Sequence, residues 1–233
     1  MLGFLYKELF TMRYHLLFSF LFSTVLIASS QFIRADNVFE YLLGQGATVI
    51  LAFVISNAVY DQSFQGDEGG NFLDFAASAP CSLRGHLAAK YIFILAANTM
   101  LLFICAAVEF IARDIFSIND SALSSVGIVI LAICLIMSAL NFPFVVCLGS
   151  GKGNTVALIV LLLIVFGAIV YFLFGDISFL FTRNSAEYII KFFTDGSSQR
   201  ILLIIIFLSV PVYLLSYIIA LPLYKKGIEK IRG

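Results

Sequence analysis

The sequence predicts an all-α membrane protein with six transmembrane helices. Apolar residues make up 61% of the 233 residues and charged residues only 12%, whereas soluble domains are about 45–50% apolar and about 25% charged. The apolar residues form six long stretches, and a helix needs about 20 such residues to cross the hydrocarbon core. We therefore expect one transmembrane domain over residues 1–233, with no room for a soluble catalytic or nucleotide-binding domain.

The six expected spans are separated by short polar connections, except after the second and the fifth. The last span contains Pro211 and Pro222, and we expect the helix to end near Pro222 because proline cannot continue the backbone hydrogen-bond pattern. The spans cover residues 16–33, 42–60, 91–108, 123–148, 155–174 and 201–223.

Residues 1–15 predict a short helix that lies in the membrane interface and leads into the first span. Its apolar residues recur at helical spacing, and its charged residues fall elsewhere on the helical wheel. A cleaved signal peptide ending near Ala28-Ser29-Ser30 is the alternative. The apolar set is Leu2, Leu5, Tyr6, Leu9 and Phe10, and the charged set is Lys7, Glu8 and Arg13.

Charge asymmetry predicts that both termini lie in the cytoplasm. Six spans place the termini on one side, and nine of the 14 Lys and Arg residues fall on that side, including the basic tail after Tyr224. Positive residues favour the cytoplasmic side of a membrane protein. The net formal charge is zero, which gives no basic patch for nucleic acid.

The polar segment 61–90 between the second and third spans is expected to be a cytoplasmic elbow. After the acidic pair Asp67-Glu68, Phe72 and Phe75 share one face of a short helix, which suits docking into a groove of a partner. Ser78 precedes Pro80, which ends that helix. Ser82 can cap a new helix that runs through Arg84 into the third span.

The widest outer segment, 175–200, predicts a helix lying on the membrane surface or partly re-entrant. Ala186, Ile189, Ile190 and Phe193 share a helical face within it. No residue pattern in this segment indicates a ligand.

Polar residues within the spans leave two interpretations open. Asn57, Asn98 and Asn141 can join helices by hydrogen bonds or line a translocation path. Glu109 and Arg113, four residues apart, can form a local ion pair or contact a substrate.

No catalytic or metal-binding set is evident in the sequence. Residues 149–155 resemble a phosphate loop, but Val146 occupies the position of its first glycine, so we expect a tight turn. Cys81, Cys105, Cys134 and Cys147 include no C-x-x-C pair, and we expect reduced thiols used in packing. With only two histidines, no metal site is expected. The chain is therefore not expected to be an enzyme.

The elbow and topology resemble the ABC-2 type permeases of ABC transporters. The match is carried by the acidic stretch at Asp67 and by five residues beyond it: Ser78, Pro80, Arg84, Lys90 and Tyr91. The small size and short outer loops are most similar to permeases of bacterial peptide-toxin exporters, such as the phenol-soluble modulin exporter.

The resemblance implies a complex with two cytoplasmic ATPase subunits and a second permease, either an identical copy or a sister subunit. The helix around 72–77 would be the coupling helix, with Asp67, Glu68, Phe72, Phe75, Ser78, Pro80 and Arg84 forming the contact to the ATPase. The permease would bind no cofactor, and ATP and magnesium would bind to the ATPase. We expect a bacterial plasma-membrane exporter of amphipathic or hydrophobic peptides. The alternatives are an immunity or assembly subunit that binds another cytoplasmic partner, and a self-contained channel.

Overall fold

The computed structural model describes residues 2–31, 44, 46–68, 82–116, 123–175 and 196–232, and these are almost entirely helical. The predicted all-α class is confirmed for this part of the chain. The helices are α1 (Leu2–Ser30), α3 (Ala47–Glu68), α5 (Ser82–Phe116), α6 (Leu123–Leu148), α7 (Ser150–Phe174) and α9 (Gly196–Arg232).

Four of the described helices are long and apolar enough to cross a membrane. They are α1, α5, α6 and α9, by length and composition. α3 and α7 overlap the second and fifth predicted spans but are not among these four helices, so the count of six spans stays a prediction. Many large apolar side chains on these helices are exposed, as expected where lipid rather than water is the solvent.

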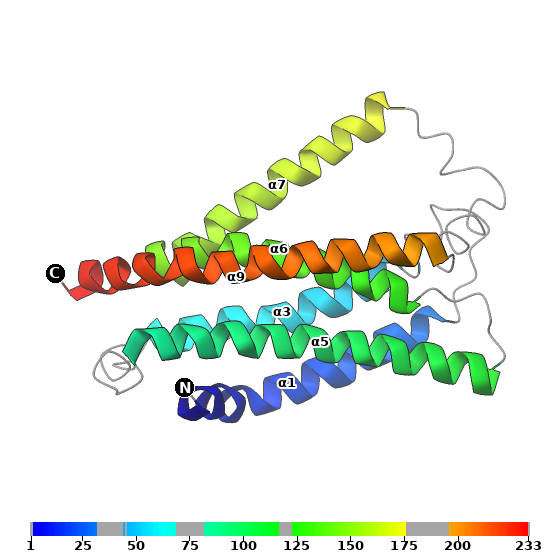
Figure 1. Cartoon of the computed structure of the whole chain (residues 1–233), viewed down its shortest axis with the longest axis horizontal. Coiled ribbons are helices and arrows are strands. Elements are labelled where there is room, and N and C mark those ends of the chain that lie inside the picture. Colours follow the sequence, from blue (N-terminus) through cyan, green and yellow to red (C-terminus); the bar gives the residue numbers. More distant parts are fainter. Residues whose placement is uncertain are drawn as a thin grey trace.

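Most of the helices run lengthwise beside one another (Figure 1). α1 packs against α3 and α5, α5 packs against α6, and α6 packs against α9. α7 contacts α6 and α3 but diverges from the bundle towards its C-terminal end (Figure 1). Both ends of the chain lie at the same end of the bundle (Figure 1), which we call the terminal end.

The first helix is continuous from Leu2 to Ser30, with no break between an interfacial helix and a span. Its N-terminal half has the predicted apolar face, because Leu2, Tyr6 and Phe10 are exposed. The opposite face is buried and contains Glu8. Whether the first turns lie in the interface stays a prediction.

The polar segment after the second span differs from the expected elbow. α3 does not end near Tyr60 but continues for two turns through Asp61 to Glu68. The extension places Asp67 beside basic side chains of other helices, so the acidic residues do not mark the start of a loop. The beginning of α5 at Ser82 agrees with the prediction, and the expected helix at 72–77 lies outside the described residues.

The C-terminal helix also differs from its expected length. α9 continues past Pro222 to Arg232, and the prediction that it ends near this proline was wrong. Pro211 likewise lies inside the helix. The outer segment 175–200 falls mostly outside the described residues, and its predicted helix remains untested.

The tight turn predicted at residues 149–155 is confirmed and is shorter than expected. Gly149 alone separates α6 from α7, and its φ of 85° lies in the left-handed region that glycine adopts without strain. Its amide donates to the carbonyl of Val145 at 2.9 Å, and the amide of Gly153 donates to the carbonyl of Gly149 at 2.8 Å. These bonds join the two helices with almost no intervening chain.

Candidate functional site

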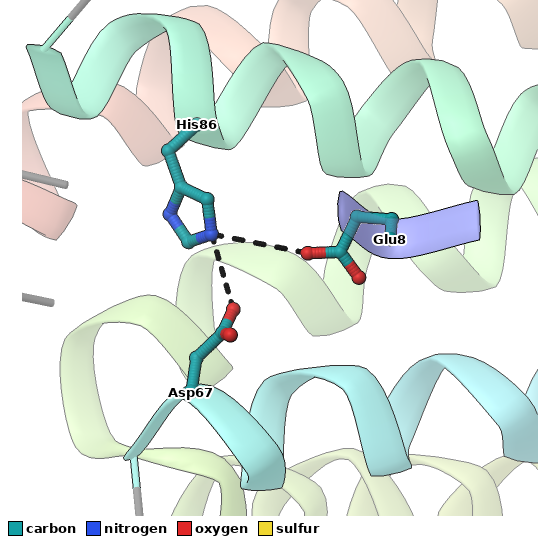
Figure 2. A group of neighbouring side chains, drawn as sticks. All are labelled: Glu8, Asp67 and His86. Carbon is teal, nitrogen blue, oxygen red and sulfur yellow. Dashed lines mark hydrogen bonds and ion pairs between the residues drawn. The ribbon is translucent and has the colours of Figure 1, made fainter. Parts of the chain in front are cut away.

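Five ionisable side chains from three helices meet inside the terminal end of the bundle. We call this group the buried charge cluster; it consists of Lys7, Glu8, Asp67, His86 and Lys90. Figure 2 shows Glu8 of α1, Asp67 of α3 and His86 of α5 pointing toward one another. Glu8 and His86 are 0% exposed, Lys90 is 2% exposed and Asp67 is 3% exposed.

The position of each charged residue in its helix explains why its side chain lies in the cluster. His86 and Lys90 are four residues apart in α5 and therefore share one face of the helix. Glu8 lies between Phe4 and Met12 on the buried face of α1. Asp67 is in the last turn of α3.

The two carboxylates and the two ammonium groups form a network of ion pairs. Lys90 Nζ lies 2.6 Å from Asp67 Oδ2 and 3.3 Å from Glu8 Oε1. Lys7 Nζ lies 3.0 Å from Glu8 Oε1 and also pairs with Asp67. Each carboxylate thus contacts both lysines, which is the arrangement that makes buried charge tolerable.

His86 connects this network to the last helix. Its Nε2 lies 3.0 Å from Asp67 Oδ2, and its Nδ1 lies 2.8 Å from the hydroxyl of Tyr224. A carboxylate only accepts hydrogen bonds, so we assign the proton to Nε2. With this tautomer, Nδ1 accepts from the hydroxyl of Tyr224.

The environment lowers the pKa of Asp67 well below its ordinary value. Burial by itself raises this pKa, but the hydrogen bond from His86, the charge of Lys90 and the hydrogen bonds from Lys7 and Lys90 outweigh it. Asp67 is therefore ionised throughout the physiological pH range.

The cluster has the spacing of a metal site but not its charge balance. Ligand atoms of Glu8, Asp67 and His86 all lie within 4.8 Å of one another. Two ammonium groups already contact the carboxylate oxygens, and a divalent cation would have to displace them. The residues fit an ionic joint between helices better than they fit a metal centre.

Aromatic and hydroxyl groups continue from the cluster into the bundle. Lys90 Nζ lies 4.4 Å from the ring centroid of Phe64. Tyr91 bonds Ser216 at 2.9 Å, and Ser216 donates to the carbonyl of Ala139 at 2.6 Å. These contacts tie α5 to α6 and α9, because a hydrogen bond inside the bundle satisfies groups that lipid cannot.

The predicted ATPase-contact residues are only partly within the described chain. Asp67 points into the cluster, whereas Arg84 is exposed and its carbonyl accepts from Tyr217 at 3.3 Å. Glu68 ends α3. Phe72, Phe75, Ser78 and Pro80 lie outside the described residues, so the predicted coupling contact stays a prediction.

The candidate path residues are separate from the cluster. Asn98 is buried on α5 and donates to the carbonyl of Ile94 at 3.1 Å. Asn141 on α6 donates to Asn154 on α7 at 3.5 Å. The side chain of Asn57 lies outside the described part of the chain.

The predicted ion pair between Glu109 and Arg113 is present at 3.2 Å. Glu109 also accepts from the backbone amide of Ser124 at 2.7 Å, and from its hydroxyl. An acceptor at the first turn of α6 caps that helix. The pair therefore has a structural role at the end of the bundle opposite the cluster.

Sequence reasoning did not find most of the cluster. Lys7 and Glu8 were predicted only to lie away from the apolar face of the first helix, and no role was predicted for His86. The available signal was Glu8 at helical spacing between Phe4 and Met12, together with the i,i+4 pair His86 and Lys90. No local pattern indicates that these residues meet.

The long apolar helices, which the buried charge cluster connects at the terminal end of the bundle, define a multi-pass membrane protein. A model of the ABC-2 family transporter proteins matches residues 3–225, and the chain belongs to this family. No curated protein and no solved structure matches it. Membership identifies the chain as the membrane component of an ABC transporter and implies an ABC ATPase as partner.

Proposed function

We propose that this chain is the permease subunit of an ATP-driven exporter and that segment 69–81 docks on the ATPase. The observation that carries the proposal is the buried charge cluster, since Asp67 and Lys90 hold together the two helix ends that flank this segment. A displacement of the segment by the ATPase would then move the adjoining ends of α3 and α5 together. Coupling requires a contact of this kind, because a partner biases a conformational change only through differential interactions.

The complex is proposed to contain two permeases, identical or sister subunits, and two ATPase subunits that bind ATP and magnesium. The permease itself is not proposed to be an enzyme. We place it in a bacterial plasma membrane with both termini in the cytoplasm, supported by the basic tail and by the shared position of the termini (Figure 1). Protease digestion of terminal tags in right-side-out and inverted vesicles tests this placement, and cleavage in right-side-out vesicles would overturn it.

Amphipathic or hydrophobic peptides are the proposed cargo. The support is that residues 91–108 of α5, 123–148 of α6 and 201–223 of α9 contain no charged residue, and their polar residues, such as Asn98 and Ser216, are neutral. A path for small ions would need polar lining. The purified complex should hydrolyse ATP faster with amphipathic peptides. Stimulation by sugars or drugs but not by such peptides would exclude this cargo.

The docking role is tested by purifying the tagged protein from its native membrane and measuring how much ATPase accompanies it. Phe72→Ala and Phe75→Ala should each reduce that amount, because burial of an aromatic ring in a groove contributes roughly 1.5–3 kcal/mol. Phe207→Ala is the matched control, since Phe207 is exposed on α9 and should leave ATPase recovery unchanged.

Two outcomes would contradict the proposal. Wild-type recovery of the ATPase with both elbow variants would refute the docking role of segment 69–81. A homo-oligomer without ATPase, under conditions where a control transporter stays intact, would favour an immunity protein, an assembly subunit or a channel.

A further inference from the structure

The N-terminal helix is bound to both helix ends that flank segment 69–81. On α1, Lys7 pairs with Asp67 of α3, and Glu8 lies 3.3 Å from Lys90 of α5. The ring of Phe4 meets the ring of His86 edge-on at 5.4 Å between centroids, and Phe4 packs with Ala89 in a buried apolar contact. α1 therefore contacts α3 and α5 through charge and through packing at the same level.

These ion pairs oppose separate movement of the three helix ends. Withdrawing α1 would break the pairs of Lys7 with Asp67 and of Glu8 with Lys90, so the buried residues Asp67 and Lys90 would each lose an ion-pair partner. Removing one partner of a buried ion pair is costly because the remaining charge is poorly solvated. A displacement of the α3 and α5 ends is thus easier if α1 follows.

We propose that α1 is a moving part of the coupling machinery, with its N-terminal half travelling as one body with the end of α3 and the start of α5. This inference rests on the proposed function, in which the ATPase displaces segment 69–81. Glu8 and Lys90 act as positioning residues, because their ion pair transmits this displacement from α5 to α1, which contains the first span. α1 is then a driven element of the transport cycle and not only a membrane anchor.

Disulfide trapping in the reconstituted complex tests whether α1 and α5 move together. Phe4→Cys and Ala89→Cys are introduced after the four native cysteines have been replaced, and the oxidised and reduced forms of one preparation are compared. Oxidation should leave the amount of peptide transported per ATP unchanged, because the two positions do not separate. Loss of transport on oxidation, restored by a reductant, would overturn the proposal.

A charge variant provides a second test that does not depend on a cross-link. Glu8→Gln should keep the ATPase bound and hydrolysing ATP, while peptide transported per ATP falls at least about fivefold, the lower range of coupling between sites. Exchanging the charges, with Glu8→Lys and Lys90→Glu together, should restore part of the ratio. Glu109→Gln is the matched control, because Glu109 is a half-buried carboxylate with partners at the opposite end of α5.

The outcomes separate this inference from the function on which it rests. An unchanged ratio for Glu8→Gln, with ATPase bound, would refute the role of α1 and leave the permease assignment intact. Absence of an ATPase from the wild-type complex would refute the proposed function and this inference with it.

Discussion

The hydroxyl of Tyr224 lies 2.8 Å from Nδ1 of His86, and both residues are buried. This bond joins the last helix to the first turns of α5, across 138 positions of sequence. Because His86 also contacts Asp67 of α3, the bond extends the buried charge cluster from three helices to four.

Tyr224→Phe should lower the stability of the detergent-solubilised protein. The change keeps the ring but removes the donor to His86, and the loss of a buried hydrogen bond costs about 0.5–1.5 kcal/mol. Thermal unfolding followed by circular dichroism measures the effect. Tyr217→Phe is the control, because its hydroxyl makes a longer bond of 3.3 Å in an exposed position. An equal decrease in Tm for both variants would contradict a special role for the bond to His86.

Asp67→Asn should lower the stability of the folded protein much more than Tyr224→Phe does. The substitution leaves two ammonium groups facing one remaining carboxylate inside the bundle, and breaking a buried pair costs about 3–5 kcal/mol. Chemical unfolding of the two proteins at pH 7 measures the difference. Asp114→Asn, at an exposed position next to Arg113, should change stability by no more than about 0.5 kcal/mol. Comparable losses from the two variants would show that Asp67 does not depend on its buried partners.

The stabilisation due to Asp67 should depend on pH in one direction. Its pKa is lowered on folding from the ordinary value of 3.8, so the folded state favours the ionised form. The contribution is fully present above pH 3.8 and is lost as the pH falls toward the lower pKa of the folded state. The stability advantage of the wild type over Asp67→Asn should therefore not decline between neutral pH and about pH 5. A difference that already declines between pH 7 and 6 would contradict the lowered pKa.

Local patterns in the sequence predicted the helices but not their inner faces. Composition and span length predicted the all-α class, Ser82 marked the start of α5, and the spacing of Glu109 and Arg113 indicated their ion pair. These features depend on residues close together in the chain. The apolar face of α1 was also predicted from the sequence. In the structure this face is exposed, as expected where lipid rather than water surrounds the helix.

The buried charge cluster could not be predicted because its members come from three distant parts of the chain. An acidic residue at the end of a span ordinarily indicates a loop in water, and Asp67 was interpreted in that way. In the structure Lys7 and Lys90 supply its counter-charges, so α3 extends by two turns. Pairing between distant residues thus overrides the local signal.

Gly153→Ala should destabilise the junction of α6 and α7. A Cβ at this position would lie 2.5 Å from Val145 Cα and 2.7 Å from Val145 N. These are backbone atoms that cannot move aside as a flexible side chain can, and overpacking of this kind costs about 1–3 kcal/mol. Gly151→Ala is the matched control two residues away, where an added Cβ meets nothing within 4 Å and the better helix propensity of alanine should stabilise α7 by up to about 1 kcal/mol. We therefore expect opposite signs for the two changes in Tm, and a decrease of equal size in both would show that the close approach of α7 to α6 at Gly153 is not what the structure describes.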